Sequence, residues 1–211
     1  MIDTAFFITS FVTLFVIIDP IGLTPMFVAL TQGMSAKQRR SIAMRATLVS
    51  AGILALFAIF GEALLGFIGI SMAAFKIAGG ILLLLTALDM LFQRRAKRRE
   101  DTAEEDDALD DPSVFPLAIP LIAGPGSIAT VILLAGQQDD MLGFALTLAV
   151  TVLVLCVTFI FFQSAGFLER ILGKTGIDVV SRLLGMLLAA LAVQFMLNGL
   201  QDFGVLGIAP T

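Results

Sequence analysis

The amino-acid sequence predicts an all-α membrane protein with six transmembrane helices, arranged as a 3+3 inverted repeat. The first observation is composition: 58% of the 211 residues are hydrophobic and 14% are charged, whereas a soluble domain is nearer half apolar and a quarter charged. The second is that apolar runs of about 20 residues, enough to cross a bilayer core, recur along the chain. The third is a pair of proline- and glycine-rich motifs, roughly 105 residues apart, which interrupt two of these runs.

The first motif, Asp19–Pro25, lies within a run that we expect to cross the membrane at 4–30. Proline lacks a backbone donor and clashes with the preceding turn, so Pro20 and Pro25 predict a broken or kinked helix. In hydrocarbon the freed backbone groups need partners, so such a break persists only inside protein or beside a wet cavity. Two interpretations of Asp19 stay open. It is either an N-cap followed by proline at N1, or a substrate-binding and proton- or ion-coupling group, since a carboxylate at that depth is rarely kept without a task.

The other elements follow from polar interruptions of the apolar sequence. Ser35 is a suitable N-cap before span two, and Gly69–Ser71 is a tight, uncharged link to span three. The second motif, Pro120–Ser127, predicts a break in span four for the same reason as the first. Spans two to six are expected at about 41–68, 72–92, 114–135, 141–168 and 179–200.

The distribution of charge predicts the domain organisation and the orientation. We expect a first repeat at 1–92, a charged cytoplasmic loop at 93–113 and a second repeat at 114–203, which together form one membrane domain. Basic residues lie between spans one and two, three and four, and five and six, and short loops rich in Lys and Arg stay cytoplasmic. Both termini are therefore predicted on the non-cytoplasmic side. Because each half has three spans, the second half enters the membrane upside down, as in transporters whose substrate binds near the midplane.

The two motifs together form a candidate substrate site. Where a helix restarts, free N–H groups and the positive dipole end favour a carboxylate, and glycine lets a ligand approach the backbone. A small zwitterion such as an amino acid suits this set, with its ammonium group near Asp19 or unwound carbonyls. The alternative is that glycine and serine only permit close helix packing. The predicted substrate-binding residues are Asp19, Pro20, Gly22, Thr24, Gly124, Pro125, Gly126, Ser127 and Thr130.

Other residue types exclude some functions. The chain has no histidine, which removes imidazole-based acid/base chemistry and imidazole metal sites. The nucleophile, base and metal ligands of a membrane enzyme are missing too, so we expect no enzymatic activity, no metal and no cofactor. Topology explains the basic residues, so nucleic-acid binding is not expected. Cys156 is expected to be buried, and Gln194 and Asn198, four apart, share one face of span six and can face the bundle interior.

The motifs Asp19-Pro20-Ile21-Gly22-Leu23-Thr24-Pro25 and Pro120-Leu121-Ile122-Ala123-Gly124-Pro125-Gly126-Ser127 together resemble the MarC family. This is a family of six-span bacterial and archaeal inner-membrane proteins, also classed with small neutral amino-acid transporters. The resemblance covers nearly the whole chain, about 1–200. It implies a multi-pass protein of the inner membrane and a proton- or ion-coupled carrier of alanine- or glycine-like substrates.

We therefore predict a secondary transporter of small neutral amino acids that works by alternating access. Its expected partners are this substrate and the lipid bilayer, and its oligomeric state stays open. Two alternatives also stay open: a channel or exporter for another small solute, and a non-transporting inner-membrane protein of the MarC type.

Overall fold

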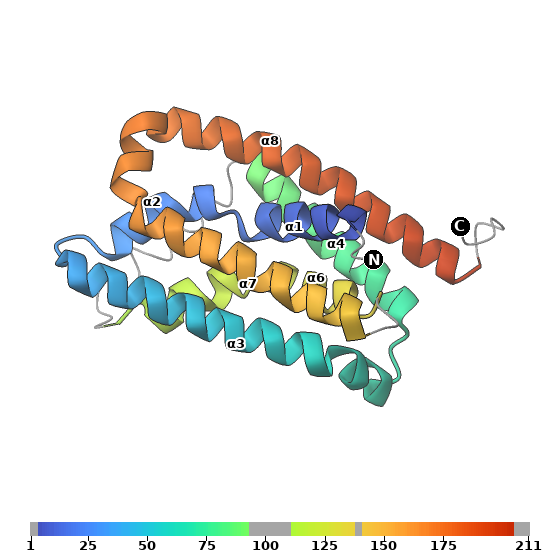
Figure 1. Ribbon diagram of the computed structural model, residues 1–211. Coiled ribbons are helices and arrows are strands. Elements are labelled where there is room, and N and C mark those ends of the chain that lie inside the picture. The colour runs from blue at the N-terminus through green and yellow to red at the C-terminus, as the bar shows by residue number, and fades with distance from the viewer. Residues whose placement is uncertain (1–3, 93–110, 138–140, 205–211) are drawn as a thin grey trace.

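A computed structural model describes residues 4–92, 111–137 and 141–204, and within these ranges the chain is helical with no strand (Figure 1). The elements are α1 (Thr4–Ile18), α2 (Pro20–Leu30), α3 (Ala36–Ile68), α4 (Met72–Leu91), η1 (Ser113–Ile122), α6 (Pro125–Ala135), α7 (Met141–Gln163) and α8 (Ala165–Asp202). The all-α fold predicted from the sequence is thus confirmed. The three predicted segments of the chain stay a prediction, because most of the 93–113 loop lies outside the described residues.

Local sequence explains where the longer helices begin and end. Ser35 caps α3 through a capping box, in which its hydroxyl accepts the Gln38 N–H and the Gln38 side chain accepts the Ser35 N–H. Gly69 ends α3 in the left-handed region, at φ 84°, which glycine adopts without a Cβ clash. The Ser71 hydroxyl then accepts the Ala74 N–H and starts α4. The predicted N-cap at Ser35 is confirmed, and α3 begins a turn earlier than the span expected at 41–68.

Five helical stretches in the described ranges are long and apolar enough to cross a membrane. They are Thr4–Leu30 (α1 with α2), Ala36–Ile68, Met72–Leu91, Met141–Gln163 and Thr175–Asp202. A sixth arises if η1 and α6, which are bent by 56° at their junction, count as one span. The described residues therefore hold five to six candidate membrane-spanning helices, a range that includes the predicted six.

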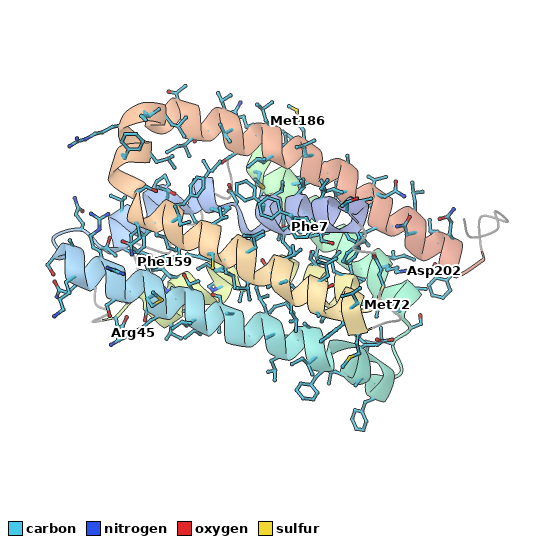
Figure 2. The ribbon with its side chains drawn as sticks, viewed as in Figure 1. Phe7, Arg45, Met72, Phe159, Met186 and Asp202 are labelled. Atoms are coloured by element: carbon cyan, nitrogen blue, oxygen red, sulfur yellow. The ribbon has the colours of Figure 1, made fainter. Side chains whose placement is uncertain are left out.

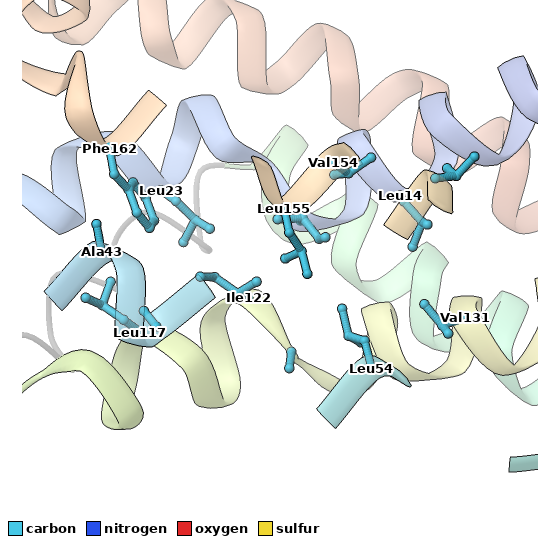
Figure 3. Packing of buried hydrophobic residues seen from close by; sticks show 14 of the residues in the cluster. Leu14, Leu23, Ala43, Leu54, Leu117, Ile122, Val131, Val154, Leu155 and Phe162 are labelled. Atoms are coloured by element: carbon cyan, nitrogen blue, oxygen red, sulfur yellow. The ribbon is translucent and has the colours of Figure 1, made fainter. Parts of the chain in front are cut away.

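The helices pack as a bundle around two apolar clusters. In Figure 1, α8 and α3 lie on opposite sides, with α1, α2 and α7 between them. The larger cluster joins α1, α2, α3, η1, α6 and α7, and includes Leu14, Leu54 and Phe162, all fully or almost fully buried (Figure 3). The smaller cluster joins the end of α1 to α4, α6 and α8 through residues such as Ile17, Leu83 and Leu188.

The outer surface is apolar along the bundle and charged near its ends. Many large hydrophobic side chains point outward, among them Ile8, Leu48 and Met186 (Figure 2). Such a surface suits contact with lipid, because an aqueous surface rarely carries apolar patches of this extent. Arg45 lies at one end of the bundle and Asp202 at the other (Figure 2).

Helices α4 and α8 pack closely and run antiparallel. A Cβ at Gly80 of α4 would lie 2.6 Å from Met196 Cγ and 2.7 Å from the Ala192 carbonyl oxygen. A Cβ at Gly185 of α8 would lie 3.0 Å from Met90 Cβ. In each helix a glycine, which has no side chain, therefore allows the other helix to approach closely, as small residues do between membrane helices.

Two side chains differ from their expected positions. Cys156 is exposed on α7 rather than buried, because α7 is apolar on all sides and its sequence does not show which side faces the protein. Gln194 is also exposed, and its Nε2 donates to Asn198 Oδ1 at 2.8 Å. The two amides do share one face of α8, but Gln194 faces outward rather than into the bundle interior.

Candidate functional site

The first motif places Asp19 between two helices. Helix α1 ends at Ile18 and α2 begins at Pro20, while Asp19 has φ 54° and ψ 62°, in the left-handed region. Aspartate is one of the few residues other than glycine that visit this region. The backbone bonds continue through the turn, from Asp19 N–H to the Phe15 carbonyl and from Leu23 N–H to the Asp19 carbonyl, both at 2.9 Å. The backbone polar groups of Asp19 itself are thus paired.

The carboxylate of Asp19 caps α2. Its Oδ1 accepts the Gly22 N–H at 3.0 Å, Pro20 takes the first helical position, and only 2% of Asp19 is exposed. A Cβ at Gly22 would overlap the carboxylate, so glycine is needed here for the cap to close. The N-cap interpretation of Asp19 is therefore seen directly, while its role in substrate binding or ion coupling stays a prediction.

The hydroxyl of Thr24 is satisfied within α2. Thr24 is fully buried, and its Oγ1 donates to the Pro20 carbonyl at 2.8 Å, one turn earlier. Serine and threonine in membrane helices commonly bond the carbonyl four residues back. Both polar side chains of the first motif, Asp19 and Thr24, therefore already form hydrogen bonds within the protein.

The second motif places a sharper bend between η1 and α6. Phe115 and Ile119 have extended backbone, because each precedes a proline. Gly124 is the N-cap of α6, with no side-chain hydrogen bond to the helix start, and Pro125 occupies the first helical position. A Cβ at Gly124 would overlap the Pro120 carbonyl oxygen, so the chain can double back this closely only with glycine here.

The polar residues of α6 are buried. Ser127 is 2% exposed and Thr130 is 0% exposed. Among the described residues, no group forms a hydrogen bond with Thr130 Oγ1. Pro125, by contrast, is exposed.

The two motifs approach each other in the folded chain. A Cβ built on Gly126 would lie 3.5 Å from Ile17 Cγ2, 3.6 Å from Leu83 Cδ2 and 3.8 Å from Thr86 Oγ1. Ile17 lies two residues before Asp19, and Gly126 lies two residues after Gly124. The start of α6 therefore lies beside the end of α1, with α4 closing the same space. Ile17 could have been named from its place beside the motif, whereas no feature of the sequence marks Leu83 or Thr86.

Two ion pairs lie at the ends of the bundle. Arg45 of α3 contacts Asp111 at 2.5 Å, just before η1, and Lys76 of α4 contacts Asp202 of α8 at 2.6 Å. Hydrogen bonding by Ser113, whose N–H donates to Asp111 Oδ1 at 3.0 Å, together with the Arg45 guanidinium, holds the pKa of the Asp111 carboxyl below its usual value. These pairs join separate elements but lie away from the two motifs.

The fold and its two motifs define a multi-pass, α-helical integral membrane protein. The chain belongs to the MarC family: the model of this family, described as "MarC family integral membrane protein", matches residues 4–203. The resemblance seen in the two motifs is thereby confirmed.

Proteins from archaea and bacteria are similar to this chain over almost its full length. One, named UPF0056 membrane protein, from Methanocaldococcus jannaschii, is 40% identical over 94% of this chain and 98% of its own. UPF0056 membrane protein YvbG of Bacillus subtilis is 36% identical over 93% of this chain and 95% of its own. A UPF0056 membrane protein of Archaeoglobus fulgidus is 39% identical over 94% of this chain and 93% of its own. No solved structure matches the chain.

Proposed function

We propose that this protein is a secondary transporter of a small neutral amino acid, such as alanine or glycine, coupled to a proton or another ion. It would work by alternating access in the inner membrane of a bacterial or archaeal cell, with both termini on the non-cytoplasmic side. The proposed cycle moves a solute and includes no chemical reaction, metal or cofactor. A protein of this kind needs a polar site within the bilayer and a fold that can open to either side in turn.

The observation that carries the proposal is the meeting of two helix interruptions, at Gly126 and Ile17. Polar and unwound backbone at membrane depth is kept where protein or a cavity shields it from lipid. Here Asp19, Thr24, Ser127 and Thr130 are all buried. A site built at such a junction can offer a helix N-terminus to a carboxylate and oxygen atoms to an ammonium group, which are the two charged ends of a neutral amino acid.

The pattern of helix contacts supports an inverted repeat. If α1, α2, α3 and α4 correspond to η1, α6, α7 and α8, then several packing contacts between the halves have a counterpart. Helix α3 packs on η1 and α6, as α7 packs on α1 and α2. Helix α4 packs on α6, as α8 packs on α2. The exchange is imperfect, because α1 contacts α6 and α8 more than η1 contacts α2 and α4.

The antiparallel pair α4 and α8 supports the same relation at the level of residues. Gly80 of α4 contacts Met196 of α8, and Gly185 of α8 contacts Met90 of α4. The two glycines, Gly80 and Gly185, are 105 residues apart in the sequence, and the two methionines, Met90 and Met196, are 106 residues apart. Two helices related by a two-fold axis in the plane of the membrane give this reciprocal arrangement.

The predicted site residues divide into two groups in this proposal. Pro20 and Pro125 fix the helix restarts, and Gly124 allows the close turn before α6. Asp19, Gly22 and Thr24 form the first side of the site, and Gly126, Ser127 and Thr130 form the second. Proton or ion coupling is assigned to Asp19, a buried carboxylate on the path between the halves.

Counterflow in liposomes tests the proposal. Purified protein is reconstituted in vesicles loaded with unlabelled alanine or glycine, and entry of labelled alanine is followed with and without internal substrate. A carrier gives transient accumulation of label that requires internal substrate, and empty vesicles without protein serve as the control. Label that equilibrates equally with and without internal substrate indicates a channel, and the absence of both entry and binding indicates a protein that does not transport these solutes.

A further inference from the structure

The N-terminus of α6 differs from that of α2 in having no side-chain cap. The Asp19 carboxylate accepts an N–H in the first turn of α2. Gly124, in the corresponding place before α6, has no side chain, and no side-chain cap hydrogen bond is formed in the described part of the chain. The N–H groups of Gly126 and Ser127 therefore reach the second and third helical positions without an acceptor from a capping side chain, and they carry the positive end of the helix dipole.

Thr130 provides a second, independent observation. Eight other buried hydroxyls in the membrane helices donate to the carbonyl four residues earlier: Thr13, Thr24, Thr31, Thr47, Ser50, Thr147, Thr151 and Thr158. Three buried hydroxyls in the described part of the chain form no hydrogen bond: Ser10 of α1, Ser113 of η1 and Thr130. Of these only Thr130 lies in α6, where the Gly126 carbonyl is one turn back. A buried hydroxyl without a partner is unfavourable, since its hydrogen bond with water is lost and not replaced. A ligand acceptor at this place would satisfy it.

The hydroxyl and the free N–H groups lie on one face of α6. Residues three and four apart on a helix are neighbours, so Thr130 lies above Ser127 and Gly126. Helical side chains lean toward the N-terminus, so the Thr130 side chain lies over the turn that contains Gly126. Gly126 contributes no side chain to that turn, and a methyl group on Gly126 would lie at ordinary contact distances of 3.5 to 3.8 Å from its neighbours. Packing alone thus does not require glycine at 126, unlike at 124.

We propose that this face of α6 binds the carboxylate group of the transported solute, an inference that rests on the function proposed above. The N–H groups of Gly126 and Ser127 and the hydroxyl of Thr130 donate to the carboxylate oxygens. The Thr86 hydroxyl donates to the Leu82 carbonyl at 2.9 Å, so its oxygen keeps lone pairs that can accept from an ammonium group. Ile17 and Leu83 lie against the same space and restrict the substituent on the α-carbon to a small one.

Ligand-dependent stabilisation of the purified, full-length protein tests this placement. Melting temperatures are measured for the wild type with alanine, with propionate, which keeps the carboxylate but lacks the ammonium group, and with alaninamide, which lacks the carboxylate. A ligand that prefers the folded state raises the melting temperature in proportion to the logarithm of its excess over Kd. The same series is run on Gly126→Ala and Thr130→Val, with Gly52→Ala as the matched control, because a Cβ at Gly52 meets nothing within 4 Å.

The proposal predicts that alanine and propionate stabilise the wild type and that alaninamide does not. Thr130→Val is expected to weaken alanine binding about tenfold, the effect of one hydrogen bond to a charged group. Gly126→Ala is expected to abolish binding, because its methyl group takes the place of the carboxylate, while Gly52→Ala binds as the wild type does. Wild-type affinity for alanine in both α6 variants, or equal binding of alaninamide, would overturn the placement and leave the carrier intact.

The remaining outcomes separate the inference from the proposed function. Stabilisation by propionate but by no amino acid, lost in Gly126→Ala, would retain the carboxylate site and reject the amino-acid carrier. Stabilisation by none of the three probes would reject both.

Discussion

The starts of α2 and α6 share the same order of cap residue and proline but differ in whether a side chain caps the helix. Each has a cap residue followed by proline, at Asp19-Pro20 and at Gly124-Pro125. In α2 a buried carboxylate of the chain itself already occupies the positive end of the helix. In α6 the cap residue has no side chain, and the buried Thr130 hydroxyl nearby has no partner among the described residues. A similar break is thus capped by the chain itself in one half of the molecule, and in the other half it is where we propose that a ligand binds.

This difference predicts opposite responses to substitution. Changes at the start of α2 should lower the stability of the protein, because they remove contacts that the chain already makes. Changes at Gly126 and Thr130 of α6, where no such contact is lost, should have little effect on stability without ligand and a large effect on binding.

The largest loss of stability is expected for Gly22→Ala. The new Cβ would overlap the Asp19 carboxylate, so the cap would open and the hydrogen bond between Gly22 N–H and Asp19 Oδ1 would be lost. We expect a loss of about 2 kcal/mol, the upper range for a lost N-cap. Thermal unfolding in detergent measures it, with Gly66→Ala as control because a Cβ there meets nothing within 4 Å. Equal melting temperatures for the two variants would show that the cap does not close as described.

The next contrast is between two threonine-to-valine changes. Thr24→Val removes a hydrogen bond of 2.8 Å and should destabilise the protein by about 1 kcal/mol. Thr130→Val removes a buried hydroxyl without a partner and should be neutral or stabilise it by up to about 1 kcal/mol. Paired melting curves without ligand compare the two. A Thr130→Val protein less stable than Thr24→Val would contradict the difference between the two restarts.

A smaller effect on stability is expected for Asp19→Asn. Asparagine caps helices about as well as aspartate and tolerates the left-handed backbone found at this position, so the change in stability should stay within about 1 kcal/mol. If Asp19 also carries the coupled proton, uptake of labelled alanine by this variant should no longer respond to an imposed pH gradient. Normal pH-driven uptake in a well-folded Asp19→Asn protein would leave Asp19 with the capping role alone.

The smallest effect is expected at the Arg45–Asp111 pair, far from both motifs. Since the folded state lowers the pKa of Asp111, the pair stabilises the fold above the carboxyl's usual value of 3.8 and loses this contribution as the pH falls through the lowered pKa. Both side chains are largely exposed, so we expect at most about 0.5 kcal/mol. Melting curves of the wild type and Asp111→Asn should differ slightly at pH 6, and this difference should shrink as the pH falls below 3.8. A difference that grows toward acid would reverse this assignment.

The sequence predicted the helical fold well, because apolar run length is a local property. The helix boundaries at 18–20 and 122–125 lie at the two proline-containing motifs, while the inverted repeat with two broken spans stays a prediction. The absence of a cap side chain before α6 could also be read directly, since glycine stands at 124 where aspartate stands at 19.

Side-chain direction could not be predicted in the same way. Nothing local distinguishes the hydroxyl of Thr130 from that of Thr24, and only the fold brings Leu83 and Thr86 of α4 beside Gly126. Cys156 is exposed although its neighbours are apolar, because a helix surrounded by lipid and protein is apolar on both sides. Periodicity therefore indicates the protein-facing side of a membrane helix less clearly than that of a soluble one.

The central claim, that the two interrupted segments meet at Ile17 and Gly126, can be tested directly by disulfide cross-linking. In a Cys156→Ser background, cysteines are placed at 17 and 126, and a protease site is inserted between residues 93 and 110. A Cβ at 126 would lie 3.5 Å from Ile17 Cγ2, and a cysteine sulfur at 17 occupies such a γ position, so a disulfide can form there with small adjustments. The account predicts that oxidation keeps the two cleaved halves together on a denaturing gel and that reduction separates them. Halves that separate without reduction, in a folded protein, would contradict it.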